Sequence, residues 1–513
     1  TSTLIEVVGN ATVSGTLGVT GIATFTDDII IGDGKTIGSA SDVDAITIAS
    51  NGQLTLTQTL IGTALDISGD IDVDGTSNLD IVDIDVSLDV NGTIKLDGNY
   101  PTGTDNVALG DTALDSVEAG GVGNVAIGSK AGTAITTGDN NVAIGTCSLL
   151  VNTTGYDNVG IGRRALDANI SGLANVGIGS SALTANTTAN SNVAVGTCAM
   201  FVNTTGTCNT AIGTVALAAN TTASFNTAVG MRAMLNTTTG NKNVAVGTSA
   251  MQCNTTGSAN TAVGGMDANA FPTMFANTTG SSNTAIGNSA LICNTTASNN
   301  TAVGKNALAV NTTGATNTAV GQNSLNSNTT AADNTAVGAG SLYANTEGTG
   351  NTAVGRQALV ANTTANSNTA VGASALYSNT TGANNVAVGR TALENSTTAT
   401  ANTAIGFGSL RANTDGHSNT GAGQCALNGN TTGDHNTAVG FNALDSNTTA
   451  NNNTAVGSNA LCLNIEGHCN TAVGFNALLK NTTQRNTAVG AYAALCNTTG
   501  QQNVAVGYYT LDA

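Results

Sequence analysis

The chain of 513 residues has no tryptophan, two prolines, and only 3% aromatic and 9% charged residues. The shortage of Lys, Glu and Arg argues against a helical domain, and the abundant Thr, Asn, Gly and Val favour short strands separated by turns. The two prolines, Pro101 and Pro272, stand where the pattern described below is interrupted. This placement is expected if the rest of the chain is sheet, because proline cannot donate to a strand ladder.

Long apolar runs and positive charge are also scarce. No run approaches the roughly 18 apolar residues that span a bilayer, so we expect no membrane insertion. The formal net charge is -18, and 16 of the 31 acidic residues lie in residues 1–105. Such a surface repels phosphate and offers few rings for stacking on bases. We therefore expect no nucleic acid among the partners.

The nine cysteines are an odd number scattered over the chain, which does not suggest a disulfide framework. We expect free, small side chains in core or turn positions. Near the three histidines, His417, His435 and His468, no Ser, Cys or carboxylate recurs in a triad-like arrangement. Although His417 and His435 stand one repeat apart, we interpret them as turn residues. No catalytic residue, cofactor or metal site is predicted, and we expect the protein not to be an enzyme.

What the chain has in abundance is a repeat. The string Asn-Thr/Val-Ala-Val/Ile-Gly occurs twenty-four times between Asn106 and Gly507, almost always at a spacing of seventeen residues. Numbered from this Asn, positions 8–9 are Ala/Ser-Leu and positions 12–15 are Asn-Thr-Thr-Gly/Ala. A short fixed period means that each repeat is one rung, which buries its apolar side only by stacking on its neighbours. The sequence predicts an all-β parallel β-solenoid (β-roll) of about 24 rungs.

The sequence predicts two domains. Residues 1–102 form an Asp/Gly-rich β shaft module, in which Asp70–Asp74 alternates acidic and apolar residues as a half-buried strand does. A solvated acidic face is favoured there over a Ca²⁺ site, because no complete binding loop is present. Residues 103–513 form the solenoid, with an insertion near 265–276. The insertion should bulge from one turn and leave Met274 in the core at position 9.

Alternation within the rung predicts two strands, with positions 4, 9 and 11 pointing into the core and position 10 pointing outward. Position 3 then faces away from the core, yet it is Ala in twenty-one rungs and Gly in three. We interpret this restriction as close packing against another chain around a shared axis. The alternative is a thin roll in which position 3 faces inward and positions 2 and 4 face out. The predicted chain–chain packing residues are Ala302, Ala319, Ala336 and Ala353.

The Asn residues at positions 1 and 12 and the aromatic residues at position 6 each lead to a further prediction. Asn at positions 1 and 12 should form hydrogen-bonded ladders along the stack, although the Asn-Thr-Thr copies also match the N-glycosylation pattern. Outward position 6 carries an aromatic residue at every second rung near the C-terminal end. These rings are a candidate contact surface for host glycans or a partner protein, or they cover a neighbouring turn or chain. They are Phe407, Phe441, Phe475 and Tyr508.

The rung resembles the repeats of two known groups. Asn141–Gly145, which reads Asn-Val-Ala-Ile-Gly, is similar to the repeat of trimeric autotransporter adhesin heads. That resemblance implies a left-handed parallel β-roll packed as a trimer, although the rung here is three residues longer. The full rung pattern, together with the opening segment Val7–Leu17, looks more like tail-fibre and related appendage proteins of tailed bacteriophages. Such fibres often end in a C-terminal chaperone that is cleaved off, and since the last rung ends at Ala513 without a cap, we expect a removed domain or a fragment.

Three functional hypotheses follow. The leading one, implied by the resemblance, is a homotrimeric structural fibre, an extracellular virion tail appendage that contacts a host-cell receptor or glycan. The second is a cellular surface adhesin or a subunit of an extracellular filament. The third is an ice- or surface-binding protein with Thr ladders, against which the frequent Val at position 2 counts.

Overall fold

The computed structural model describes residues 6–26, 29–32, 35–37, 46–51, 53–56, 103–265 and 271–512. The chain divides into two compact units, residues 1–93 and 94–513. In the first unit, β1 (Lys35–Ile37), β2 (Ile46–Ile48) and β3 (Leu54–Leu56) form an antiparallel sheet in the order β1-β2-β3. The strand predicted at 70–74 lies outside the described residues.

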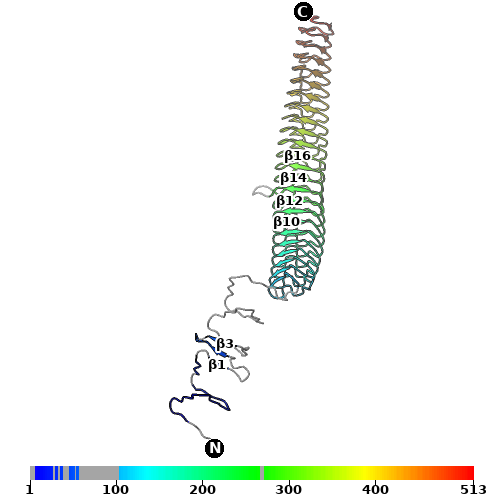
Figure 1. Cartoon of the computed structure of the whole chain (residues 1–513). Coiled ribbons are helices and arrows are strands. Elements are labelled where there is room, and N and C mark those ends of the chain that lie inside the picture. The colour runs from blue at the N-terminus through cyan, green and yellow to red at the C-terminus, as the bar shows by residue number, and fades with distance from the viewer. Residues whose placement is uncertain are drawn as a thin grey trace. The chain divides into compact units, whose positions relative to one another are not determined.

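The second unit is a parallel β-solenoid, as predicted (Figure 1). Each rung contributes one strand of three residues at positions 2–4, and no helix occurs among the described residues. Successive strands pair in parallel without any shift in register, so that Thr318 lies beside Thr301. The strands are β4 (Val107–Leu109), β5 (Val125–Ile127), β6 (Val142–Ile144), β7 (Val159–Ile161), β8 (Val176–Ile178), β9 (Val193–Val195), β10 (Thr210–Ile212), β11 (Thr227–Val229), β12 (Val244–Val246), β13 (Thr261–Val263), β14 (Thr284–Ile286), β15 (Thr301–Val303), β16 (Thr318–Val320), β17 (Thr335–Val337), β18 (Thr352–Val354), β19 (Thr369–Val371), β20 (Val386–Val388), β21 (Thr403–Ile405), β22 (Thr420–Ala422), β23 (Thr437–Val439), β24 (Thr454–Val456), β25 (Thr471–Val473), β26 (Thr487–Val489) and β27 (Val504–Val506).

Backbone hydrogen bonds join each rung to the rungs on either side. The amide of Thr301 donates to the Asn317 carbonyl in the next rung, and the amide of Gly304 donates to the Ile286 carbonyl in the preceding rung, both at 2.8 Å. At about 4.8 Å per rung, the stack from β4 to β27 is a rod of about 110 Å.

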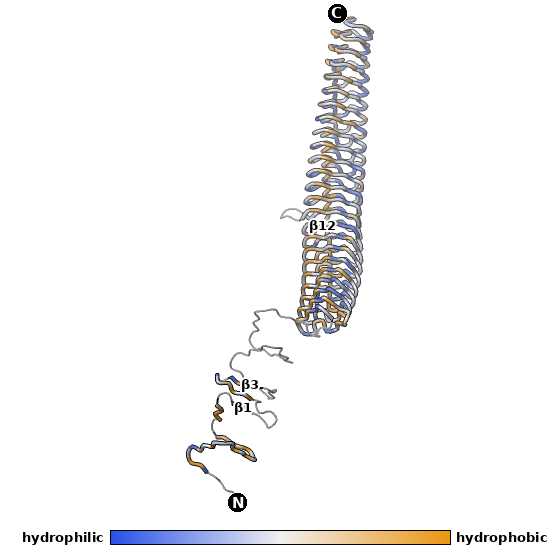
Figure 2. Tube along the Cα trace, viewed as in Figure 1, coloured by the Kyte–Doolittle hydropathy of each residue, from blue (hydrophilic) through white to orange (hydrophobic). Residues whose placement is uncertain are grey.

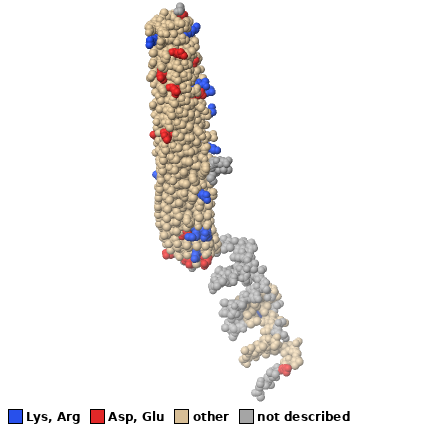
Figure 3. Space-filling view, turned by 180° about the vertical axis from the view of Figure 1, so that it is seen from behind, with Lys and Arg blue, Asp and Glu red and all other residues tan. Residues whose placement is uncertain are grey.

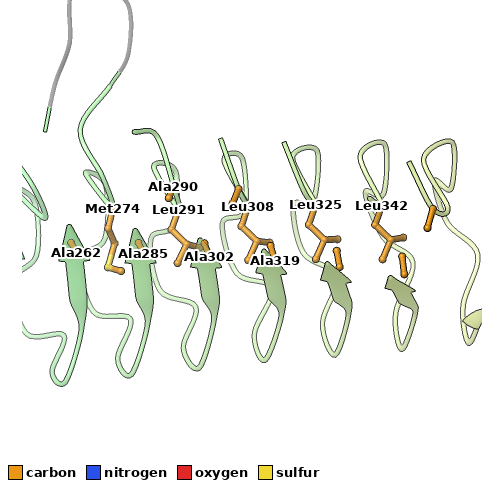
Figure 4. Close-up of a cluster of buried hydrophobic side chains, with 14 of the residues drawn as sticks. Ala262, Met274, Ala285, Ala290, Leu291, Ala302, Leu308, Ala319, Leu325 and Leu342 are labelled. Atoms are coloured by element: carbon orange, nitrogen blue, oxygen red, sulfur yellow. The ribbon is translucent and has the colours of Figure 1, made fainter. Parts of the chain in front are cut away.

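The core of the solenoid lies inside the single chain and is built from positions 3, 8 and 9. In the rung that contains β15, the side chains of Ala302, Ala307 and Leu308 are fully buried. Figure 4 shows the Leu side chains of the connecting segments directed at the Ala column of the strands. Leu at position 9 is therefore confirmed as a core residue.

The prediction that position 3 packs against another chain is wrong. Ala302, Ala319, Ala336 and Ala353 are 0% exposed in the single chain, because the Leu column of their own chain covers them. Positions 2 and 4 are partly exposed on the outer face of the sheet, as in β17, so the alternative of a thin roll is correct. Larger side chains are excluded at position 3 because the roll has room for only one bulky residue per rung, which is the Leu or Met at position 9.

The second predicted strand, at positions 9–11, does not form. The backbone is left-handed at three positions of the rung, with φ of 57° at Asn306, 50° at Leu308 and 62° at Thr316, and this pattern recurs along the stack. A left-handed residue at position 9 breaks the alternation of a strand. Position 11 consequently points outward, and the Val310 side chain is 39% exposed.

The two Asn ladders are confirmed. At position 1, Asn300 Oδ1 accepts the Asn317 amide at 2.9 Å, and Asn317 Nδ2 donates to the Ala331 carbonyl. At position 12, Asn311 Nδ2 donates to Asn294 Oδ1 at 3.1 Å and to the Gly314 carbonyl at 2.9 Å. The position 12 side chain is fully buried and its amide hydrogens are used. The folded rod therefore offers this Asn for hydrogen bonding along the stack and not for a glycan.

The insertion leaves the ladder undisturbed, as predicted. Strands β13 and β14 on either side of it pair with Thr261 beside Thr284. Met274 occupies position 9, is fully buried, and donates its amide to the Ala290 carbonyl at 2.9 Å. Pro272 stands at position 7, where other rungs have a left-handed residue. Since proline fixes φ near −65°, this rung must take a different path there.

Candidate functional surfaces

The aromatic residues at position 6 point outward, as predicted. Phe407, Phe441 and Phe475 are 44–48% exposed, and Tyr508 is 71% exposed. The guanidinium of Arg390 lies 5.9 Å from the centre of the Phe407 ring, a distance at which a cation and a ring attract each other. The column is thus a series of accessible rings near the C-terminal end of the rod.

Two tyrosines that the sequence interpretation missed enlarge this column. Tyr492 and Tyr509 occupy position 7 of the last two rungs, and their rings stack with centres 4.5 Å apart. Tyr492 also meets the edge of Phe475 at 5.2 Å, and Tyr509 meets Tyr508 at 4.7 Å. The sequence could have predicted this contact, because position 7 adjoins position 6 in every rung and both tyrosines stand at position 7. The rings of Phe475, Tyr492, Tyr508 and Tyr509 form a continuous aromatic surface. Such a surface suits contact with sugar rings or apolar side chains.

The outer face of the sheet carries a long apolar column at position 4. Val337, Val371 and Val439 are 36–39% exposed, and Ile405 is 47% exposed. Partly buried Thr or Val at position 2 runs beside this column. Figure 2 shows hydrophobic segments repeating at the same place in successive rungs. A contiguous apolar surface of this length is typical of an interface with another protein.

An apolar groove of about 530 Å³ lies beside the insertion. It forms where the side chain at position 10 shrinks along three rungs, from Phe275 through Ile292 to Ala309. Phe271 and Val310 flank it, and both are exposed.

Two of the three histidines take part in a side-chain ladder that the sequence interpretation missed. His417 Nδ1 accepts the Thr400 amide at 3.0 Å, and His468 Nδ1 accepts the Asn451 amide at 2.9 Å. The side chains of Ser, Asn and Asp at the same position 16 accept a backbone amide in the same way, as the Ser281 hydroxyl accepts the Ser258 amide. What these variable residues share is a hydrogen-bond acceptor near the backbone. Across the described ranges, no group of three or more His, Cys, Asp or Glu residues could hold a metal ion.

All nine cysteines are free and none is fully buried, so of the two expected placements, core or turn, they do not take the core. Cys208, Cys469 and Cys496 are exposed, and the others are partly buried. Burial raises the pKa of the thiols of Cys253 and Cys293. A thiol with a raised pKa stays protonated and is a poor nucleophile.

The fold places the chain in the class of β-solenoid repeat proteins. No protein family model, curated protein or solved structure matches the chain. Among the described residues, no helix is long and apolar enough to cross a membrane.

Proposed function

We propose that the chain is a structural fibre protein, a rigid homotrimeric appendage of a phage virion that mediates attachment to a host surface. The fold supports a mechanical role, because nearly identical rungs share one continuous core and build a rod rather than a unique pocket. The resemblance of the rungs and of Val7–Leu17 to tail fibres supports the assignment to a virion.

The observation that carries the proposal is the apolar outer face of the sheet. Val or Ile at position 4 is repeated along the rod and is left half-exposed, as at Val303 and Val337. A rod in isolation has no reason to keep this column apolar, whereas a copy of the same chain offers a matching column at every height. Three such faces around one axis would cover each other, which is the arrangement that the similarity to trimeric adhesin heads implies.

Sedimentation velocity of the purified chain tests the assembly. We expect an elongated particle with three times the 50.2 kDa mass of one chain. A 50.2 kDa particle at every concentration would overturn the trimer. Replacing Val303, Val320 and Val337 by Asp should release monomers that keep their β-sheet circular dichroism spectrum, because these side chains lie outside the core of the single chain.

Attachment is tested on whole bacterial cells. The proposed receptor surface is the aromatic column, with Phe441 and Phe475 at its centre. A labelled fibre should bind cells of the host strain, and the double variant Phe441→Ala, Phe475→Ala should lose most of that binding while still forming the rod. Unchanged binding by the variant removes the column as the receptor surface, and no binding by the unmodified fibre to any strain of a broad panel counts against attachment.

Two other functions make different predictions. A cellular adhesin or filament subunit would be encoded beside a membrane-anchor segment, whereas a tail fibre would be encoded among tail and baseplate genes. An ice-binding protein would use exposed Thr columns, and the Thr at position 14, such as Thr313, is exposed along the rod. That function requires thermal hysteresis in a freezing assay, and its absence excludes it.

A further inference from the structure

The charged residues of the solenoid are divided between the two ends of the strands. Positions 6 and 7, which follow each strand, carry seven of the eleven Lys and Arg residues after residue 105 and one acidic residue. The last four positions of the rung, which precede the next strand, carry seven acidic residues and two basic ones. We call these the basic edge (Lys130, Arg163, Arg164, Arg232, Lys305, Arg356 and Arg390) and the acidic edge (Asp139, Asp157, Asp333, Glu347, Asp415, Asp434 and Glu466).

Most of these charges form no ion pair with the part of the chain that the structure describes, although Asp139 and Asp434 accept backbone amides and Asp415 accepts the Thr398 hydroxyl. In the described residues, ion pairs join Arg164 to Asp167 and Arg411 to Glu394, and Arg164 alone belongs to an edge. Arg163, Arg356, Asp157 and Glu347 are all exposed. In Figure 3, charged side chains are sparse on the rod, and several of the basic ones lie along one margin.

The opposite charges also coincide in height. Asp157 precedes β7 and Arg163 follows it, so the two stand at opposite ends of one strand. Glu347 lies in the turn five residues before β18, and Arg356 follows that strand by two residues, so this pair also flanks one strand in the same order. Between the ends of each of these strands lies the apolar outer face. At the heights of β7 and β18, the acidic edge, the apolar face and the basic edge therefore follow one another across the rod.

Symmetry decides which edges meet when apolar faces are covered by other copies. In any cyclic arrangement of parallel rods about a common axis, the edge that follows the strands in one copy adjoins the edge that precedes them in the next copy, at the same height. Antiparallel rods related by a perpendicular twofold axis would instead bring edges of one sign together. The charge distribution favours the first arrangement and penalises the second.

We propose that copies of this chain associate side by side, parallel and in register, with the basic edge of each copy against the acidic edge of the next. The pairs Arg163–Asp157 and Arg356–Glu347 join neighbouring copies at β7 and β18. This proposal rests on the proposed self-association and adds to it the direction and register of the copies. The partner that fits the edges is a second copy of this chain.

Charge reversal tests the pairing. The basic-edge variant Arg163→Glu, Arg356→Glu and the acidic-edge variant Asp157→Lys, Glu347→Lys should each raise the dissociation constant of the assembly at least about tenfold, because every interface then carries like charges. The variant with all four changes should return to within about threefold of the unmodified protein, since opposite charges meet again. Lys480→Glu is the control, the same kind of charge reversal at an exposed site away from both edges and outside the Arg411–Glu394 ion pair.

Sedimentation velocity measures the assembly, and circular dichroism checks that each variant keeps its fold. If the unmodified chain is a monomer, the proposed trimer fails and this inference fails with it. If the unmodified chain assembles and both edge variants match the control, the edges do not pair. The proposed trimer is then kept and the edge pairing is rejected. Failure of the fourfold variant to recover, while both edge variants are weakened, also overturns the pairing.

Direction and register are tested by cross-linking. Carbodiimide treatment of the assembled Arg356→Lys variant should join Glu347 of one copy to the substituted position 356 of another, as identified by mass spectrometry of mixed isotope-labelled chains. Interchain cross-links from position 356 only to acids several rungs away would overturn the register.

Discussion

The two halves of each rung keep the same register by different means. Positions 1–5 hold a short strand, whose backbone bonds to both neighbouring rungs and whose only inward side chain is Ala or Gly. Positions 6–17 contain no strand and include three left-handed residues, yet they stack as regularly, as in the bond from the Leu308 amide to the Ser324 carbonyl. Regular stacking therefore requires only that each residue repeat the conformation of the one in the rung before it.

The difference shows in which substitutions each half accepts. The strand half tolerates Thr or Val at outward position 2 but keeps Gly at position 5 throughout. The connecting half varies freely at positions 6 and 7 but keeps Leu or Met at position 9 in nearly every rung.

The largest effect is expected at the end of the strand half. Gly304 has φ of 130°, and a Cβ there would lie 2.6 Å from the Gly321 carbonyl oxygen of the next rung. Gly304→Ala should cost about 4 kcal/mol or more, because neither the backbone conformation nor the neighbouring backbone can yield. Thermal unfolding followed by circular dichroism measures this loss of stability. Gly340→Asn is the control: its φ is 66°, position 7 is Asn in several rungs, and the loss should stay below about 1 kcal/mol.

The next effect tests whether the amide ladder replaces strand pairing in the connecting half. Asn311→Leu removes the donor to Asn294 Oδ1 and to the Gly314 carbonyl, both buried. We expect a loss of about 3 kcal/mol, because buried polar groups are left without partners. Asn311→Thr should cost less, since Thr237 occupies the same position in another rung and accepts the Asn254 side-chain amide at 3.3 Å. Equal stability of the Leu variant and the unmodified protein in urea unfolding would show that the ladder contributes nothing.

A third prediction separates side-chain shape from side-chain volume at position 9. Leu308 has φ of 50°, a conformation that β-branched residues rarely adopt. Leu308→Ile conserves the volume but should cost about 2 kcal/mol, whereas Leu308→Met should cost under about 1 kcal/mol. Met200 and Met274 already occupy this position in other rungs. If the Ile variant is as stable as the Met variant in denaturant unfolding, the left-handed conformation places no limit on this column.

The smallest effect concerns a partly buried acid in the connecting half. Burial raises the pKa of Asp445 above its ordinary value, although a hydrogen bond from Asn428 opposes the shift. A carboxyl with a raised folded pKa lowers stability once pH exceeds its unfolded pKa, and this cost disappears as pH falls below that value. Asp445→Asn should therefore raise the free energy of unfolding slightly at pH 7, by less than about 1 kcal/mol because the group is partly solvated, and leave it unchanged near pH 3, as thermal unfolding at the two pH values measures. Glu466→Gln, at an exposed turn, controls for the lost charge.

Several features followed from the sequence because the period repeats them in every rung. The parallel solenoid, the buried Leu column, the two Asn ladders and the phase of Met274 across the insertion were all predictable. The left-handed connection could also have been found. Position 9 carries Leu or Met in nearly every rung and never Val or Ile, which is unexpected for a strand but is favoured by a positive φ.

Which face of the strand lies inside depends on how the whole rung folds. Alternation shows that positions 2 and 4 share one face and position 3 the other, but it does not say which face meets the core. Val at position 4 favoured one choice and the uniform Ala at position 3 the other. The depth of the Leu column settles the choice, because Leu308 reaches across the roll and leaves Ala302 room for a single methyl group. That distance depends on how the connecting segment folds back, and the strand residues alone do not encode it.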